Sequence, residues 1–310
     1  MRLAADHVRV TVPATAGNLG PGFDAMGMAL DVVDEVEVRA LATSEVTIEI
    51  EGQGAGELPT NEDHLVVRAL REAIEHVGAS QMGLHIKATN RIPHGRGLGS
   101  SAAAVVAGIS AARALIAEPE ALSAEAALKL ATVFEGHPDN AAPAIYGGAT
   151  IAWQDADGAH AAPLTVAAGV ESAVLIPRSV LPTKQARSVL PAQVPHSHAA
   201  FNAGRAALLV NALAGRPEDL FAATEDKLHQ DYRADVMAPA MAMMRHLRDQ
   251  GLAAVISGAG PSVLVLGEDL ASSFLTTGDA PWADGIGGET WQVVHTVERV
   301  PGATALRLDH

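Results

Sequence analysis

The 310-residue sequence has no cysteine and few basic residues, and both deficits restrict its function. Without cysteine, the protein has neither disulfides nor thiolate metal sites. It carries 21 lysines and arginines against 36 aspartates and glutamates, a formal net charge of −15. Binding nucleic acid requires a clustered basic surface, which this composition does not offer. We therefore expect no nucleic-acid partner, and any phosphate ligand must be held locally.

Long apolar segments are also missing. The longest, residues 102–112, contains Gly108 and Ser110, stops at Arg113 and is too short to span a bilayer. Residues 1–7 lack the apolar centre of a secretion signal. With 48% hydrophobic residues, the chain can bury a core in one large or two small domains. We expect a soluble, cytoplasmic protein with no membrane partner.

A glycine-rich segment, residues 91–101, directly precedes an alanine-rich one. Gly95, Gly97 and Gly99 alternate, and Ser100 and Ser101 open the alanine-rich segment, which is typical of a buried helix. The amides of such a loop and of the first helical turn converge on one point that favours an anion. The pattern predicts a polyphosphate site, and its alternative is a serine helix cap without a ligand.

The spacing of this loop excludes two common nucleotide motifs. It lacks the Gly-Lys-Ser/Thr ending of a P-loop, and its glycines do not follow the Gly-x-Gly-x-x-Gly pattern of dinucleotide folds. It resembles, residue for residue, the phosphate loop Pro-x-x-x-Gly-Leu-Gly-Ser-Ser-Ala of the GHMP small-molecule kinases. The matching residues are Pro93, His94, Gly95, Arg96, Gly97, Leu98, Gly99, Ser100, Ser101 and Ala102.

Two other segments concentrate polar groups between glycines and prolines. In residues 14–24, Asn18 and Asp24 could hold an alcohol and an ammonium group, or they could only form turns. Residues 135–148 begin with Glu-Gly-His-Pro-Asp-Asn. Since Mg²⁺ prefers hard oxygen ligands, Glu135 and a loop serine are candidates to hold the metal of MgATP. In the alternative interpretation, Asp139 only caps a short helix.

Three candidates lie further along the chain. Arg187 and Arg233 could each bind a carboxylate through two oxygens, although an isolated arginine is by default a surface residue. Residues 257–262, Ser-Gly-Ala-Gly-Pro-Ser, form a tight turn. Its glycines, Gly258 and Gly260, allow a sharp bend or a close approach of the backbone to a ligand.

Hydrophobic periodicity and turn residues predict the secondary structure. Residues 32–40 and 46–51 are expected to form a hairpin, 159–162 give no usable signal, and 269–310 suggest a helix and one or two closing strands. The methionine-rich face of 237–250 is expected to fill the core. Strands are predicted at 7–13, 32–40, 46–51, 82–88, 149–153, 170–176 and on both sides of the 257–262 turn. Helices are predicted at 63–77, in the alanine-rich segment that Ser100 and Ser101 open, and at 123–134, 182–187, 196–214, 217–223 and 237–250.

Together these segments resemble the homoserine kinases, a family within the GHMP kinases. Residues 12–27 are similar to that family's Val-Pro-Ala-Thr/Ser-x-Asn-Leu-Gly-Pro-Gly-Phe-Asp opening, and 135–140 to its Glu-Gly-His-x-Asp-Asn. The 257–262 turn resembles the third motif of the superfamily. The resemblance covers about residues 8 to 266, and the opening segment distinguishes this family from its relatives.

The resemblance implies an α/β, two-layer GHMP kinase fold. Residues 1–155 would form the nucleotide-binding half and 156–310 a ferredoxin-like half, with the site between them and a homodimer as the assembly. The implied reaction is ATP- and Mg²⁺-dependent phosphorylation of L-homoserine. Residues 93–101 would bind the ATP phosphates, and Ser101 with Glu135 would hold Mg²⁺. The residues implied around homoserine are Asn18, Asp24, His137, Thr183, Arg187, Arg233, Gly258 and Gly260.

The resemblance leaves the catalytic base open. Several superfamily members have an aspartate base near the 135–140 motif. The resemblance to the homoserine kinases instead implies that no dedicated base is present. The candidates for catalysis are Asn18, Asp24, Asp139 and Asn140, and the base cannot be assigned between the last two. Two other functions remain: a GHMP kinase for another alcohol, such as mevalonate or a sugar, and a non-catalytic ligand sensor on the same fold.

Overall fold

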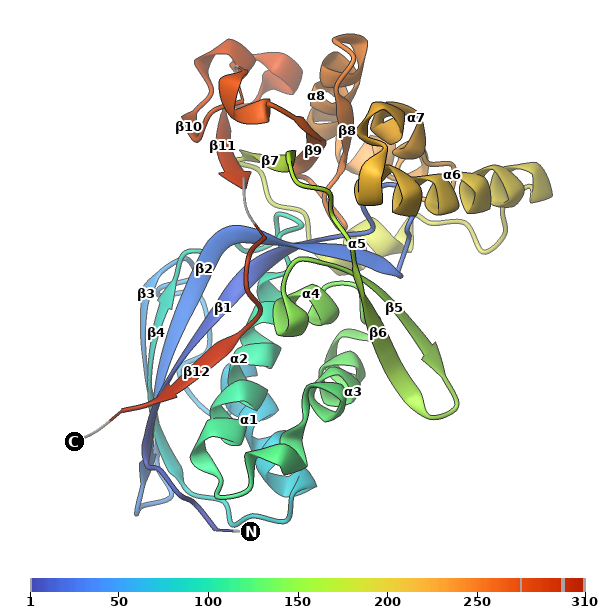
Figure 1. The fold of residues 1–310 in the computed structure, drawn as a ribbon. Helices are drawn as coiled ribbons and strands as arrows, with labels where there is room; N and C mark the ends of the chain where they lie inside the picture. The colour runs from blue at the N-terminus through green and yellow to red at the C-terminus, as the bar shows by residue number, and fades with distance from the viewer. Residues whose placement is uncertain (1, 274, 297–298, 309–310) are drawn as a thin grey trace.

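Two β-sheets, each associated with its own helices, make up the fold in Figure 1. The computed structural model describes residues 2–273, 275–296 and 299–308. The larger sheet has the order β12-β1-β2-β4-β3, with β5 paired to β2 and β6 paired to β5. Its strands are β1 (His7–Gly17), β2 (Met26–Leu41), β3 (Val46–Gly52), β4 (Gly83–Asn90), β5 (Ala149–Asp155), β6 (Gly158–Leu164) and β12 (Thr304–Arg307).

The hairpin expected between residues 32–40 and 46–51 is wrong. Both segments are strands, but β4 lies between them, antiparallel to β2 and parallel to β3. The parallel pair requires a crossover, which the first helix provides. Alternation of apolar and polar residues indicates which face of a strand is buried, but it does not indicate which strand pairs with it.

Four helices lie along one face of the larger sheet (Figure 1). They are α1 (Leu65–His76), α2 (Ser100–Leu115), α3 (Ala124–Glu135) and α4 (Ala141–Tyr146). Helix α2 is buried on nearly all sides, as its alanine-rich sequence predicts. Ser123 caps α3 as expected, whereas α1 is capped by the His64 side chain and begins two residues later than the expected Asp63.

The smaller sheet is antiparallel and has the order β10-β11-β7-β9-β8. Its strands are β7 (Val170–Pro177), β8 (Ala253–Ile256), β9 (Val263–Glu268), β10 (Gly278–Asp279) and β11 (Trp291–Thr296), and its helices are α5 (Thr183–Ser188), α6 (His196–Gly215), α7 (Leu220–Ala223) and α8 (Ala238–Asp249). The methionines of α8 lie in a second hydrophobic cluster, which confirms their core-filling role. None of the helices in the described chain is both long and apolar enough to cross a membrane.

Two strands from the later half of the chain join the larger sheet. Strand β6, for which the alanine-rich sequence gives no signal, pairs with β5, and β12 pairs with β1. The described part of the tail has strands and 3₁₀ turns, η4 (Leu270–Ser272), η5 (Pro281–Ala283) and η6 (Ile286–Gly288), in place of the expected α-helix. Residues 274, 297–298 and 309–310 of that tail lie outside the described residues. The division of the chain near residue 155 stays a prediction.

A substitution at Gly108 tests the close packing of α2 on α1. A Cβ there would lie 2.4 Å from the Val66 carbonyl oxygen and 2.9 Å from the Ala69 Cβ. Since the obstacle is helix backbone, we expect Gly108→Ala to reduce the free energy of unfolding by about 1–3 kcal/mol in denaturant titrations. Gly204, inside α6 with no atom within 4 Å, is the control, and its change to alanine should stabilise by about 0.5–1 kcal/mol. Equal effects of the two changes would contradict this packing.

Candidate active site

The phosphate loop connects β4 to α2, as the predicted order of strand, glycine loop and buried helix requires. Gly95, Gly97 and Gly99 all have positive φ, at 63°, 70° and 65°. This backbone region disfavours other residues, so the glycines are required by geometry. Gly99 caps α2 without a side-chain hydrogen bond, and the first-turn amides of a 16-residue helix begin at Ser100. The loop therefore presents N–H groups and a positive helix end to an anion.

A buried carboxylate anchors the start of this loop. One oxygen of Asp34, on β2, accepts hydrogen bonds from the backbone N–H groups of Arg91 (2.6 Å) and Ile92 (2.8 Å). Asp34 is only 7% exposed, and burial raises its pKa to about 6 even though both amide hydrogen bonds act in the opposite direction. Sequence reasoning missed this anchor, because Asp34 lies within a strand of alternating polarity.

The middle of the loop is attached to the smaller sheet. The Ser257 hydroxyl donates to the Gly97 carbonyl at 2.7 Å. The Arg96 guanidinium donates to the carbonyls of Pro177 and Arg178, both at 2.9 Å, at the end of β7. The Arg96 side chain thus connects two parts of the fold, and a role for it in phosphate binding stays a prediction. Pro93 and Arg96 line a separate hollow beside β7 and β11.

A cavity of about 250 Å³ lies between the loop, the end of α3 and the two polar segments. It brings together most of the residues that were predicted from distant parts of the chain. Its lining includes Asn18, Gly95, Gly97, Leu98, Gly99, Ser100, Ser101, Glu135, His137, Asp139, Asn140, Thr183, Arg187, Arg233 and Gly258. Gly260 is not among the lining residues, and its backbone N lies 2.8 Å from where a Gly97 Cβ would be.

Ser101 and Glu135, the predicted metal ligands, are adjacent. The Ser101 hydroxyl donates to the Glu135 carboxylate at 2.5 Å. Burial raises the pKa of Glu135, and the Ser101 hydrogen bond and His137 oppose the shift. A hydroxyl and a half-buried carboxylate are oxygen donors that Mg²⁺ prefers, and a cation beside them would offset the cost of burial. These two residues therefore fit the metal.

Asp24, His137 and Asp139 are a second group whose potential ligand atoms lie within 4.8 Å of one another. The Arg187 guanidinium already donates to both Asp24 oxygens, at 2.6 and 3.2 Å. His137 Nδ1 lies 2.5 Å from the Asp139 carboxylate. Burial lowers the pKa of His137, but the hydrogen bond and charge of Asp139 outweigh it and raise the pKa. Because the Arg187 guanidinium already occupies both Asp24 oxygens and the group includes a nitrogen ligand, it does not fit Mg²⁺.

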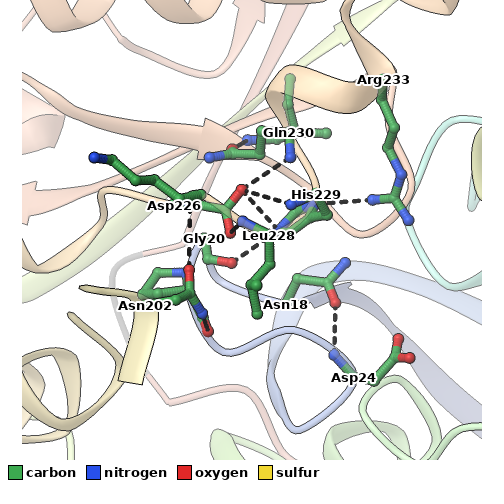
Figure 2. A network of polar contacts seen from close by, with 12 residues as sticks. Asn18, Gly20, Asp24, Asn202, Asp226, Leu228, His229, Gln230 and Arg233 are labelled. Atoms are coloured by element: carbon green, nitrogen blue, oxygen red, sulfur yellow. Dashed lines mark hydrogen bonds and ion pairs between the residues drawn. The ribbon is translucent and has the colours of Figure 1, made fainter. Parts of the chain in front are cut away.

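The Asn18 amide is held by backbone groups on both sides. Its Nδ2 donates to the Gly258 carbonyl at 2.7 Å. Its Oδ1 accepts from the Asp24 N–H at 2.9 Å, as Figure 2 shows. Both Asn18 and Asp24 have positive φ, so the loop is folded tightly around this amide. Asn140 similarly accepts from the Thr15 hydroxyl at 3.0 Å. These amides position the loops of the cavity.

Arg233 is a buried residue, not a surface arginine. It lies in η3 (Asp231–Val236) and is 1% exposed. Its Nε donates to the Ala186 carbonyl at 3.1 Å and its Nη1 to His229 Nδ1 at 2.9 Å. Burial, followed by the charge of Arg187, lowers its pKa to about 10, so it remains a cation at neutral pH. Arg187 and Arg233 both lie over the Phe23 ring, at 5.8 and 5.7 Å from its centroid.

A second cavity, of about 240 Å³, shares Ser100 and Ser101 with the first as lining residues. Its walls include His94 of the loop, His64 at the start of α1, Leu58 and Pro59, and three alanines of α2. Burial lowers the pKa of both histidines, so they are neutral at pH 7. Sequence reasoning missed this cavity, because its residues outside the phosphate loop come from several elements and carry no shared motif.

Comparison with known proteins identifies the family. Residues 64–148 match the GHMP kinases N terminal domain. Homoserine kinase from Clavibacter michiganensis is 51% identical over 263 residues, 85% of this chain and 83% of that protein. The chain belongs to the homoserine kinase family. The Streptomyces avermitilis homoserine kinase is 47% identical over 98% of this chain and 97% of its own. The crystal structure of homoserine kinase from Cytophaga hutchinsonii superposes with a TM-score of 0.81, at 27% identity and 99% coverage of both chains.

These comparisons confirm the resemblance and the two-layer GHMP kinase fold that the motifs implied. They do not bear on the roles of individual residues, which stay predictions.

The raised pKa of Asp34 predicts a pH-dependent stability. A carboxyl group whose pKa rises on folding favours its neutral form in the folded state. Its contribution is therefore complete below its ordinary pKa of 3.8 and is lost as pH rises through about 6. The Asp34→Asn change keeps an oxygen for both amides and removes the charge.

We expect the free energy of unfolding of Asp34→Asn, relative to wild type, to increase by about 2 to 3 kcal/mol between pH 4 and pH 7. Denaturant titrations at several pH values measure this difference. Asp34→Ala, which leaves both loop amides unpaired, should be less stable than Asp34→Asn at every pH. A pH-independent difference between wild type and Asp34→Asn would contradict the burial of this charge.

Proposed function

We propose that this protein transfers the γ-phosphoryl group of MgATP to the side-chain hydroxyl of L-homoserine, forming O-phospho-L-homoserine for threonine biosynthesis. One observation carries the proposal: a single cavity joins an anion-binding glycine loop to Arg187 and Arg233. Asp24, which does not line the cavity, is paired with Arg187 at its wall. The family to which the chain belongs supports the same reaction.

ATP is the phosphoryl donor, with its phosphates against residues 93–101. In a chain of net charge −15, the loop amides and the start of α2 supply the positive potential that bulk composition does not. The apolar cavity beside Ser100 and Ser101 is suited to the nucleoside. Ser101 and Glu135 would hold Mg²⁺, which would neutralise phosphate charge as it develops.

Homoserine brings one ammonium and one carboxylate to the other side of the loop. Asp24 is suited to the ammonium, and Arg187 with Arg233 to the carboxylate. Asp24 and Arg187 form an ion pair with each other, so a zwitterionic ligand can replace each partner with a group of the same charge. His137, Thr183 and Gly258 complete the wall of this part of the cavity.

The main role of the cavity residues is to position ATP and homoserine, and not to act as a catalytic base. A loose phosphoryl-transfer transition state requires alignment and charge stabilisation, so a dedicated base is not essential. Asp139 lies in the cavity wall with one oxygen on His137 Nδ1. Asn18 holds the acceptor loop, and the hydroxyl proton leaves late, to the phosphate.

The alternative functions lack comparable support. Mevalonate has no ammonium group for Asp24, and a non-catalytic sensor has no need for the Ser101–Glu135 pair. A homodimer stays a prediction from the resemblance.

The reaction is tested by ADP release with MgATP and, separately, L-homoserine, L-serine, L-threonine and mevalonate. We expect release with homoserine only, and its loss in EDTA. Arg187→Ala should raise KM for homoserine about 10- to 100-fold, as for a lost charged hydrogen bond. Arg216→Ala removes an exposed arginine paired with Asp219 and should change nothing. Release without any acceptor preference would refute the assignment.

The absence of a dedicated base is tested by Asp139→Asn. Because the amide keeps an oxygen toward His137, we expect kcat to fall by less than about tenfold with both KM values nearly unchanged. General-base catalysis contributes about 10²- to 10⁴-fold. A fall of that size with binding intact, measured in steady state, would instead assign the base to Asp139.

A further inference from the structure

His229 is a buried imidazole whose hydrogen bonds allow one protonation state. It is 0% exposed. Its Nε2 lies 2.8 Å from the Gly20 carbonyl oxygen, which can only accept. Its Nδ1 lies 2.9 Å from Arg233 Nη1, which can only donate. Figure 2 shows the ring between these two partners. The imidazole is therefore neutral, with its proton on Nε2, and burial lowers its pKa in the same sense.

The two partners of His229 belong to different parts of the acceptor site. Gly20 lies in the loop that carries Asn18 and Asp24, and Arg233 lines the cavity. His229 itself is not among the cavity-lining residues. The Phe23 ring, over which both cavity arginines lie, stacks on His229 with centroids 5.1 Å apart. The imidazole thus lies beneath the site and can act only through these neighbours.

A neutral acceptor has a specific consequence for Arg233. The guanidinium is oriented by the Ala186 carbonyl, the His229 ring and, at 3.4 Å, the Gly258 carbonyl. Among the described residues, no carboxylate forms an ion pair with it. Arg187, in contrast, is paired with Asp24. Arg233 is therefore held in place by neutral acceptors. The charges of Asp24, Asp226 and Asp139 act on it without forming an ion pair.

Asp226 keeps His229 in position. Its side chain is 0% exposed, and its carboxylate accepts from the backbone N–H groups of Leu228 (2.9 Å), His229 (3.1 Å) and Gln230 (2.8 Å). These bonds close the turn before η3, as Figure 2 shows. The same carboxylate lies 3.8 Å from His229 Nε2. Its negative charge opposes the lowering of the Arg233 pKa by burial, without an ion pair between the two side chains.

We propose that His229 is a positioning residue of the acceptor site, a neutral imidazole that joins the Gly20 loop to Arg233 and presents to the substrate carboxylate a guanidinium that no described carboxylate pairs with. The inference rests on the proposed function, since it takes homoserine as the ligand of Arg233. It predicts an effect on the binding of the acceptor and none on the binding of ATP.

Two isosteric variants separate the two hydrogen bonds. Glutamine places its amide nitrogen near the position of Nε2 and so keeps the Gly20 bond, while it loses the acceptor for Arg233. Asparagine places its oxygen near Nδ1 and keeps the Arg233 bond, while it loses Gly20. We expect His229→Gln to raise KM for homoserine about 10- to 30-fold, with kcat and KM for ATP within about twofold of wild type. His229→Asn should raise KM for homoserine less than about threefold.

A double-mutant cycle distinguishes positioning from a general loss of structure. In an Arg233→Ala background, His229→Gln should cause no further increase in KM for homoserine, because the residue through which it acts is gone. His295→Gln is the matched control. The His295 side chain, on β11 in the smaller sheet, is 7% exposed and bonded to Glu171 of β7. Its replacement should leave all constants within about twofold.

Three kinetic outcomes would overturn the proposal. They are an unchanged KM for homoserine in a folded His229→Gln protein, an equal rise in KM for ATP, and an undiminished effect in the Arg233→Ala background. Thermal unfolding of each variant shows whether it is folded.

A substrate-free measurement separates this inference from the proposed function. In ¹⁵N spectra of histidine-labelled wild-type protein at neutral pH, with the resonance assigned by its loss in His229→Gln, His229 should be the Nε2–H tautomer. Arg233→Ala should shift its Nδ1 resonance. If wild type fails to phosphorylate homoserine, the proposed function fails. The spectra would still show whether His229 is the neutral Nε2–H tautomer with Arg233 on its Nδ1. An Nδ1–H or doubly protonated ring would overturn the inference.

Discussion

Close backbone packing among three glycine-containing loops is the constraint on which the site depends. A Cβ on Gly97 would lie 2.2 Å from the Ser257 carbonyl oxygen, so the phosphate loop and the 257–262 turn approach without side chains between them. The Gly258 N–H donates to the Gly17 carbonyl at 3.0 Å. The Asn18 side-chain amide donates to the Gly258 carbonyl. These contacts join the loops of the two sheets directly, so the fold delivers the donor and acceptor regions as one unit.

The charges of the site are arranged in the same local manner. The carboxylates are held by three kinds of partner. Backbone amides hold Asp34 and Asp226, a hydroxyl holds Glu135, and a guanidinium holds Asp24. Burying a charge is costly unless hydrogen bonds or an opposite charge compensate it. The Ser101 hydroxyl is the side-chain hydrogen-bond donor to Glu135, and burial still raises the pKa of this carboxyl group, which is consistent with a cation in its proposed role.

The sequence predicted the site better than the connections between elements. The glycine loop and the polar segments at 14–24 and 135–148 were recognisable because motif, turn residues and helix start coincide within a few positions. The strand at 46–51 was recognised, but its pairing was not, because β3 packs beside β4 through a crossover. Strand β6 escaped notice because alanine and proline are poor strand formers and its stability comes from β5. Asp34 and His229 could not be identified, since each acts through a partner distant in sequence.

By itself, the sequence determined the family, the anion-binding loop, and the chemical types of the groups that meet at the site, because these depend on short segments with demanding local geometry. Only the tertiary structure decided which of these groups touch. It paired Asp24 with Arg187, buried Arg233, and placed a neutral His229 behind it. These contacts depend on burial and join residues as much as 209 positions apart. Neither the burial of a residue nor its distant partner can be inferred from the local sequence.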